Sequence, residues 1–249
     1  MAQVSDIQIE VRQKVYPAAG QAAPHAAIQD FKLTLHAGEF VCLAGPSGCG
    51  KTTLLNIVAD LDQDYDGEIR IARQQARPKI GYIFQNPRLL PWRTVRQNIE
   101  LVLQGRDATE TVDFLLETMQ LTRFQHVYPE RLSLGMSRRV AIIRAFAIDP
   151  ELLLMDEPFV SLDPPTARQV RELLLELWRK RPHTVLFVTH DLREAIALAD
   201  RLIFLSPSPM SIVGDIRVTI PRDLRRDENE IEAFRRQLLD GAPHIKQLL

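Results

Sequence analysis

The stretch GPSGCGKTT at residues 45–53 constrains the fold of this chain more than any other feature of its sequence. It follows a short apolar run at 39–44, which predicts a buried strand, and it runs into a predicted helix at 51–60. Glycines allow a backbone to curl so that its N–H groups point at a phosphate, and the helix adds its positive end. The alternative is an ordinary turn before a helix. The position between strand and helix favours a phosphate-binding loop.

The side chains of this loop fit the same interpretation. Lys51 can reach the β- and γ-phosphates of a nucleotide, and the Thr52 hydroxyl can bind Mg²⁺. The other predicted nucleotide contacts in the loop are Gly45, Pro46, Ser47, Gly48, Cys49, Gly50 and Thr53. We expect Cys49 to be a variable position of the loop and not a nucleophile.

Two further apolar runs end in residues that carry chemistry. The run at 152–155 ends in Asp156 and Glu157, and the run at 184–189 ends in His190. Ligands bind at the carboxyl ends of the strands in open parallel sheets, so Asp156 is a candidate for holding a metal and Glu157 for activating water. Two solvated acids and a structural histidine are the alternatives. The phosphate loop favours the functional interpretation.

The order of these patterns predicts an α/β fold. Continuous apolar runs alternate with helical patterns at 166–179 and 191–200, as in a parallel sheet covered on both faces. Residues 3–38 are β-like around a loop at 18–27, and residues 86–148 are mostly helical in pattern. We therefore expect an inserted helical lobe.

Composition excludes several classes of protein. The 249 residues carry a net charge of -1, so there is no global bias toward nucleic acid or anionic membranes. The two cysteines suggest no disulfide framework, which fits a reducing cytoplasm. No apolar run reaches the ~18 residues of a membrane span, and the start lacks the apolar core of a signal peptide. Any membrane role must come through a partner.

Together the motifs resemble those of the ATP-binding cassette (ABC) family, in the family's order, from about residue 7 to 205. GPSGCGKTT resembles the Walker A loop and LLLMDEP resembles Walker B. Gln85 resembles the Q-loop glutamine, LSLGM at 132–136 the signature motif, SLD at 161–163 the D-loop, and His190 the switch histidine.

The resemblance implies a P-loop NTPase cassette with a RecA-like parallel-sheet core, an N-terminal antiparallel β subdomain and an inserted α-helical subdomain. It implies one nucleotide-binding domain over 1–220, with the helical subdomain at 86–148. A charged helical tail follows at 221–249.

The resemblance also implies ATP and Mg²⁺ as cofactors and assigns roles at the site. Thr52, Gln85 and Asp156 would hold Mg²⁺. Glu157 would be the general base, while Gln85, His190 and Lys51 would act on the attacking water and the γ-phosphate. Tyr16 is the candidate to stack on adenine; a surface or core tyrosine is the alternative.

In this family two cassettes pack head to tail. The resemblance implies that Ser133, Gly135 and Met136 contact the partner's nucleotide and that Asp163 crosses the dimer seam. The usual motif is LSGGQ, so Leu134 and Met136 depart from it. Leucine does not adopt positive φ as glycine does. We expect the loop to keep a φ that leucine tolerates and the site to stay active.

The segment NPRLLPWRTVRQNIEL resembles the importer branch for nitrate, sulfonates, taurine and bicarbonate. This implies an ATPase at the cytoplasmic side of the inner membrane. Its partners would be a second cassette, as a homodimer, and permease subunits; a solute-binding protein would act indirectly. LLPW exposes apolar residues to which a permease helix could dock; the alternative is that they are lobe core.

Three other functions stay open. One is an ATPase of an exporter or lipid-extraction complex, and another is a soluble non-transport ATPase. The chain shows no basic stripe, which argues against nucleic acid as a partner. The third is a module that holds ATP as a switch without turnover. The sequence does not identify the solute.

Overall fold

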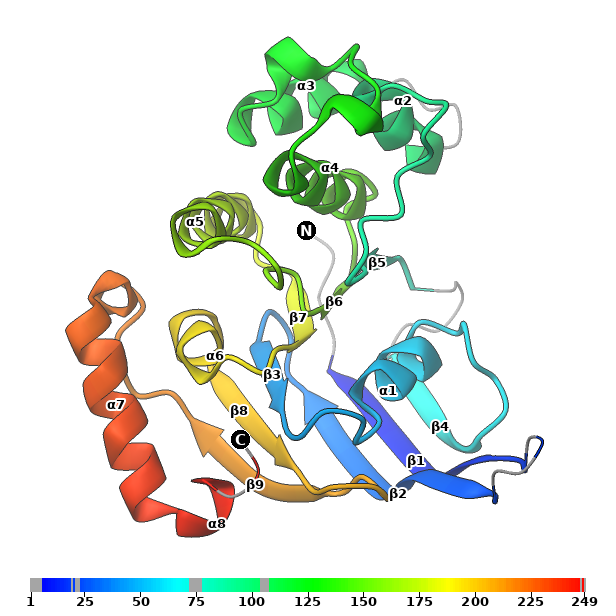
Figure 1. The fold of residues 1–249 in the computed structure, drawn as a ribbon, viewed down its shortest axis with the longest axis vertical. Coiled ribbons are helices and arrows are strands. Elements are labelled where there is room, and N and C mark those ends of the chain that lie inside the picture. The colour runs from blue at the N-terminus through cyan, green and yellow to red at the C-terminus, as the bar shows by residue number, and fades with distance from the viewer. Residues whose placement is uncertain are drawn as a thin grey trace. The chain divides into compact units, whose positions relative to one another are not determined.

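The structure, a computed structural model, describes residues 6–18, 20, 23–71, 78–103, 108–246 and 248 (Figure 1). It divides into two compact units. The first unit combines Met1–Ala76 with Thr184–Leu249, and the second unit is Arg77–His183.

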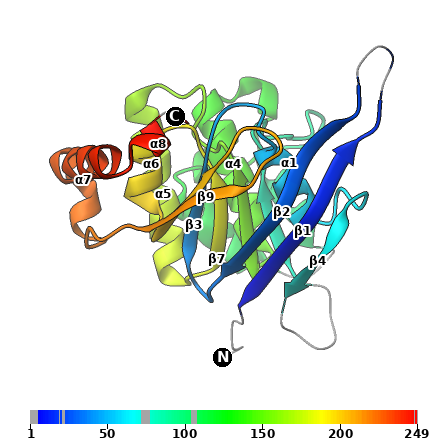
Figure 2. The same cartoon turned by 90° about the horizontal axis from the view of Figure 1, so that it is seen from below.

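An antiparallel sheet of three strands forms one part of the first unit. β1 (Ile7–Tyr16) lies between β2 (His25–Leu35) and β4 (Asp66–Ile71), as Figure 2 shows. Ile7, Ile9 and Val11 are buried at every second position, because alternate side chains of a strand share a face. The β pattern of the N-terminal segment is confirmed. The loop predicted at 18–27 ends earlier, since β2 begins at His25; residues 19, 21 and 22 lie outside the described residues.

The parallel strands of the first unit carry the phosphate loop. β3 (Phe40–Ala44) pairs in parallel with β7 (Thr184–Val188) and β8 (Arg201–Leu205), and β9 (Ile212–Arg217) is antiparallel to β8. Every residue of β3, β7 and β8 is buried, as continuous apolar runs predict. The helices α1 (Lys51–Val58) and α6 (Leu192–Leu198) follow β3 and β7 along the chain.

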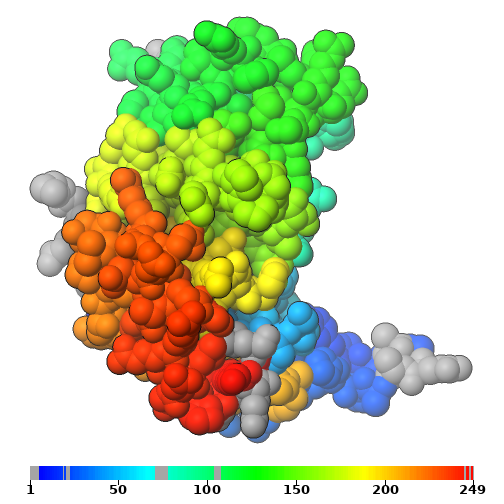
Figure 3. Space-filling view, turned by 60° about the vertical axis from the view of Figure 1, so that its left-hand side comes forward, coloured from blue at the N-terminus to red at the C-terminus, as the bar shows by residue number. Residues whose placement is uncertain are grey.

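The C-terminal segment is mostly helical in its described residues. η4 (Leu224–Arg226), α7 (Glu228–Gly241) and α8 (Pro243–Lys246) follow β9, and Figure 3 shows α7 in orange and red on the outside of this unit. Ile231 and Leu238 bury the apolar stripe of α7. A salt bridge of 3.0 Å from Arg193 to Glu232 joins α6 to α7.

The second unit pairs two parallel strands with helices. β5 (Ile80–Ile83) lies beside β6 (Leu152–Asp156). The helices between them in sequence are α2 (Val95–Glu100), η1 (Leu101–Leu103), α3 (Thr109–Thr118), η2 (Thr122–Phe124), η3 (Pro129–Arg131) and α4 (Leu134–Ala147). α5 (Pro164–Lys180) follows β6 and buries one apolar face. The helical insertion and the α/β class are therefore confirmed.

Among the residues that the structure describes, no helix is long and apolar enough to cross a membrane.

Candidate functional site

The phosphate loop leaves the buried end of β3 and enters α1 directly. Gly50 precedes the helix with φ of 112°, a conformation that residues with a Cβ rarely adopt. A Cβ on Gly45 would lie only 3.0 Å from the Leu205 Cβ, so a side chain there would press into β8. Gly50 is thus favoured by its backbone conformation and Gly45 by close packing against β8. The loop leads the chain into the N-terminus of α1, where an anion is favoured.

Lys51 lies inside the loop. Its side chain is buried, and Nζ donates hydrogen bonds of 2.8 Å to the carbonyl oxygens of Gly45 and Pro46. The ammonium group is therefore held within the loop that would cradle a phosphate. Cys49 is 2% exposed, which fits a loop position better than a nucleophile.

Tyr16 lies beside the phosphate loop. Its hydroxyl shares a hydrogen bond of 3.0 Å with the Thr53 hydroxyl, and its ring is 41% exposed. Lys14 lies with Nζ 4.9 Å from the ring centroid and is fixed by a salt bridge of 2.9 Å to Asp62. An exposed aromatic ring anchored next to the phosphate loop is suited to stacking on a base.

We expect Tyr16→Ala to weaken ATP binding about tenfold, because base–aromatic stacking contributes roughly 1–3 kcal/mol. Tyr16→Phe keeps the ring and loses only the Thr53 hydrogen bond, so it should bind ATP about as the wild type does. Fluorescent-nucleotide titration measures both affinities. Equal affinities for wild type and Tyr16→Ala would assign the adenine contact to another residue.

His190 lies at the sheet edge from which the phosphate loop emerges. Leu43 near the end of β3 pairs with Val188 at the end of β7, and His190 follows shortly after Val188 with its side chain exposed. The Thr189 hydroxyl donates to Glu194 over 2.8 Å and accepts from the backbone N–H of Asp191 over 3.1 Å. These bonds hold the backbone on both sides of His190. The predicted proximity of His190 to the loop edge is confirmed within this unit.

The acidic pair is at the end of β6 in the second unit. Asp156 is the last residue of the strand and only 5% exposed. Glu157 follows with φ of 44°, and its Oε2 accepts a hydrogen bond of 3.2 Å from Nε2 of Gln85. The structure therefore brings together two residues that are far apart in sequence and that were assigned neighbouring roles.

The chemistry of the predicted metal ligands fits Mg²⁺. Thr52, Gln85 and Asp156 offer a hydroxyl, an amide and a carboxylate oxygen, the donors that this hard cation prefers. In the part of the chain that the structure describes, no three His, Cys, Asp or Glu residues form a metal cage.

The signature segment forms the start of α4. Ser133 caps the helix, with its Oγ accepting from the Met136 N–H over 3.2 Å. Leu134 is the first helical residue; it is not among the residues with positive φ, and its side chain is 42% exposed. The expectation that the segment keeps a φ suited to leucine is confirmed, because helical φ suits any residue with a Cβ. The activity of the site stays a prediction.

Gly135 has a packing reason that sequence reasoning missed. A Cβ at this position would lie 2.6 Å from Cγ2 of Thr166, near the start of α5. The same end of α5 is capped by Asp163, whose Oδ2 accepts from the Thr166 N–H over 3.1 Å. Hydrogen bonds from Thr166 lower the pKa of Asp163. Asp163 is therefore a helix cap, whatever else it contacts.

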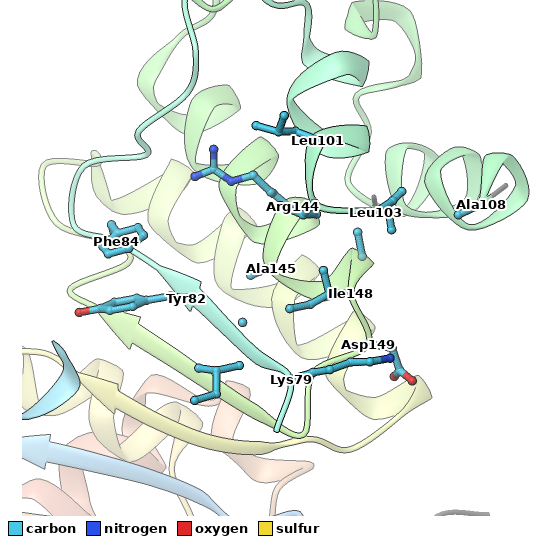
Figure 4. A pocket seen from close by; sticks show the side chains of 14 residues that line it. Lys79, Tyr82, Phe84, Leu101, Leu103, Ala108, Arg144, Ala145, Ile148 and Asp149 are labelled. Carbon is cyan, nitrogen blue, oxygen red and sulfur yellow. The ribbon is translucent and has the colours of Figure 1, made fainter. Parts of the chain in front are cut away.

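A cavity of about 820 Å³ lies in the second unit (Figure 4). Tyr82 and Phe84 line it from β5 and the residues that follow, Leu101 from η1, and Arg144 and Ile148 from α4 and its end. Leu101 is also 47% exposed. The cavity is large enough for apolar side chains of another chain.

The LLPW segment, residues 89–92, does not line this cavity. Trp92 is 69% exposed, so it is not part of the lobe core, whereas Leu89 and Leu90 are partly buried. The core interpretation is therefore wrong for Trp92.

A glycine loop between a buried parallel strand and a helix, with a lysine inside it, defines a P-loop nucleotide-binding protein. The profile of the family described as ABC transporter matches residues 28–160. The aliphatic sulfonates import ATP-binding protein SsuB of Bacillus subtilis (strain 168) is 40% identical over 240 residues, covering 94% of this chain and 92% of that protein. The nitrate import ATP-binding protein NrtD of Synechococcus elongatus is 40% identical, covering 84% of this chain and 79% of that protein.

Solved structures of ATP-binding cassettes have the same fold. The dimeric post-hydrolysis structure of the ATP-binding cassette MJ0796 with ADP and Pi has a TM-score of 0.74 and 30% identity, covering 86% of this chain and all (100%) of that chain. A dimeric MJ0796 cassette gives a TM-score of 0.75 and 31% identity. The chain belongs to the ABC transporter family, and it is an ATP-hydrolysing cassette of that family.

Proposed function

We propose that this cassette powers an importer for a small solute of the nitrate, sulfonate or taurine kind. The observation that carries the proposal is the 40% identity, over 94% of the chain, to an ATP-binding protein of aliphatic sulfonate import. The similarity to a nitrate import protein at the same identity leaves the solute itself open.

The proposed nucleotide-binding domain covers residues 1–220, with its helical subdomain at 86–148 and a C-terminal tail at 221–249.

ATP binding in this proposal uses both ends of the nucleotide. Tyr16 stacks on adenine, and the backbone of residues 45–53 with Lys51 holds the phosphates. Thr52, Gln85 and Asp156 would hold Mg²⁺, which supplies charge neutralisation on the phosphates when bound. The buried Lys51 ammonium and the anchored Tyr16 ring, both in the first unit, support this arrangement.

Hydrolysis in this proposal is in-line attack of water on the γ-phosphate. Glu157 takes the proton of the attacking water as general base, while Gln85 and His190 hold the water and the γ-phosphate. The hydrogen bond from Gln85 to Glu157 supports a shared role for these two side chains.

The proposed working form is a head-to-tail pair of identical cassettes closed by ATP. Ser133, Gly135 and Met136 would contact the partner's nucleotide at the positive end of α4, and Asp163 would reach the seam. Dimeric cassettes with 31% identity to this chain support pairing. Closure would move the permease, and hydrolysis would reset it.

Besides the second cassette, the proposed partner is a membrane permease. We propose that a short cytoplasmic helix of a permease subunit occupies the cavity beside Leu101 and Phe84. The described residues contain no membrane-spanning helix of their own, and the similar proteins are named for import. The cassette would then lie peripherally on the cytoplasmic side of the inner membrane. A solute-binding protein would act only through the permease, and no nucleic acid takes part.

The test is co-purification of tagged protein from mildly solubilised native membranes, with partners identified by mass spectrometry. We expect a multi-span permease with the wild type and its loss with Leu101→Glu, because a charge in the cavity opposes apolar docking. Leu224→Glu is the matched control: Leu101 and Leu224 each begin a 3-10 helix, and they are 47% and 46% exposed. Recovery of soluble partners alone would favour a non-transport ATPase. Recovery of an exporter permease would show that the cassette powers export and not import.

A further inference from the structure

Arg138 holds two functional segments of the second unit. It lies on α4 and is 3% exposed. Its Nη1 donates to the Phe84 carbonyl over 3.2 Å and its Nη2 to the Val160 carbonyl over 3.3 Å. Phe84 directly precedes Gln85, and Val160 ends the turn that Glu157 begins. One planar guanidinium therefore bridges the backbones that carry the two side chains.

The turn after β6 needs such support. Glu157 and Ser161 have φ of 44° and 64°, conformations that cost residues with a Cβ energy and persist only where the surroundings hold them. Within the turn, the Val160 N–H donates to the Glu157 carbonyl over 3.2 Å. Because Arg138 binds the carbonyl of Val160, it fixes the far side of this strained turn.

The burial of Arg138 is not explained by stability alone. Desolvation lowers the pKa of its guanidinium, although the charge of Glu157 opposes that effect. Its Nε has no hydrogen-bond partner among the described residues. A well-packed apolar side chain often replaces such a buried charge without loss of stability. The two carbonyl contacts are what an apolar residue would lack.

A second arginine of α4 holds the other end of the same segment. Arg144 donates to the carbonyls of Pro87 and Arg88 over 2.8 and 2.9 Å, and it also lines the cavity (Figure 4). Residues 84–88, with Gln85 among them, are thus held at both ends by the helix that begins with the signature segment.

We propose that Arg138 is a positioning residue for ATP hydrolysis. Through the two carbonyls it keeps Gln85 and Glu157 at a fixed distance from each other and links both to α4. Movement of α4, which begins with the signature segment, would therefore change the geometry of Gln85 and Glu157. The inference rests on the proposed function in one respect, the roles of Gln85 and Glu157.

The test is Arg138→Lys, since lysine keeps the charge and cannot bridge two carbonyls with a planar fork. We expect kcat to fall about 100-fold, as misplacement of catalytic groups by ~1 Å can produce. The KM for ATP should change much less than kcat, because the variant leaves Lys51 and Tyr16, the proposed contacts to the phosphates and adenine, unchanged. Steady-state phosphate release measures both parameters.

Arg139→Lys is the matched control. Arg139 is the next residue of the same helix, and its Nη1 donates to the Met119 carbonyl over 3.1 Å, away from the residue pair. It should keep wild-type kcat while losing a comparable hydrogen bond. Thermal unfolding of both variants shows whether they are equally folded. Should Arg138→Lys not fold, Arg138→Gln is measured in the same way, and the same outcomes apply.

Two results overturn the inference: a kcat of Arg138→Lys equal to that of Arg139→Lys, or a loss of kcat/KM that comes entirely from a raised KM with kcat unchanged. A different variant tests the proposed function itself. If Glu157→Gln hydrolyses ATP normally, the role of Glu157 is wrong. If Glu157→Gln is inactive while Arg138→Lys matches Arg139→Lys, only the positioning role fails.

Discussion

Glu157→Gln is expected to bind ATP as the wild type does and to lose at least about 100-fold in kcat, because a general base contributes roughly 10²–10⁴-fold. The amide keeps the size of the side chain and can still bond to Gln85, whose Nε2 lies 3.2 Å from Glu157 Oε2. The negative charge and the ability to take a proton are removed. Phosphate release and nucleotide titration measure the two properties separately.

Glu151→Gln is the control for this variant. Glu151 lies just before β6, at the opposite end of the strand from Glu157, and both side chains are of intermediate exposure. It should hydrolyse ATP at the wild-type rate. Near-normal turnover by Glu157→Gln would show that another group accepts the proton.

Lys51→Ala should weaken ATP binding itself, by about 10- to 100-fold, since a hydrogen bond to a charged group contributes roughly 1.5–3 kcal/mol. The lysine is buried in the loop and bonds to the carbonyls of Gly45 and Pro46 over 2.8 Å, so it is already at the place where phosphates would lie. Equilibrium titration with a non-hydrolysable ATP analogue measures the loss.

Two further variants show whether the loss of affinity comes from the charge of Lys51. Lys51→Met keeps the length of the side chain and removes the charge, so it should bind as weakly as Lys51→Ala. Lys32→Ala removes an exposed lysine of β2, which pairs with Glu10 over 3.2 Å, and it should leave affinity unchanged. Unchanged affinity in Lys51→Ala would count against the phosphate-loop interpretation.

Parts of the candidate site could be predicted because they depend on local patterns. The phosphate loop, the acidic residues at the end of β6 and the histidine after β7 each close a short buried run. The role of Arg138 could not be predicted in this way. Its partners, Phe84 and Val160, are distant in sequence, and α4 meets their carbonyls only after the second unit has folded.

Gly135 illustrates the same limit. The resemblance implied that Gly135 contacts the partner's nucleotide, which stays a prediction. The close approach of Thr166 is a second reason for a glycine there, and only the packing of α4 against α5 reveals it. Trp92 is a second example. An apolar residue in a run such as LLPW can lie in a core or on a surface, and only the tertiary structure shows that Trp92 is 69% exposed.

The sequence by itself determined the α/β class, the buried runs of β3, β6 and β7, and the residues of the phosphate loop, since apolar periodicity and glycine positions act over a few neighbouring residues. The tertiary structure decided which distant groups meet. It paired Gln85 with Glu157, bound Tyr16 to Thr53 and buried Arg138 between two carbonyls. Such contacts depend on how elements far apart in the chain pack together, and no local pattern of residues records that packing.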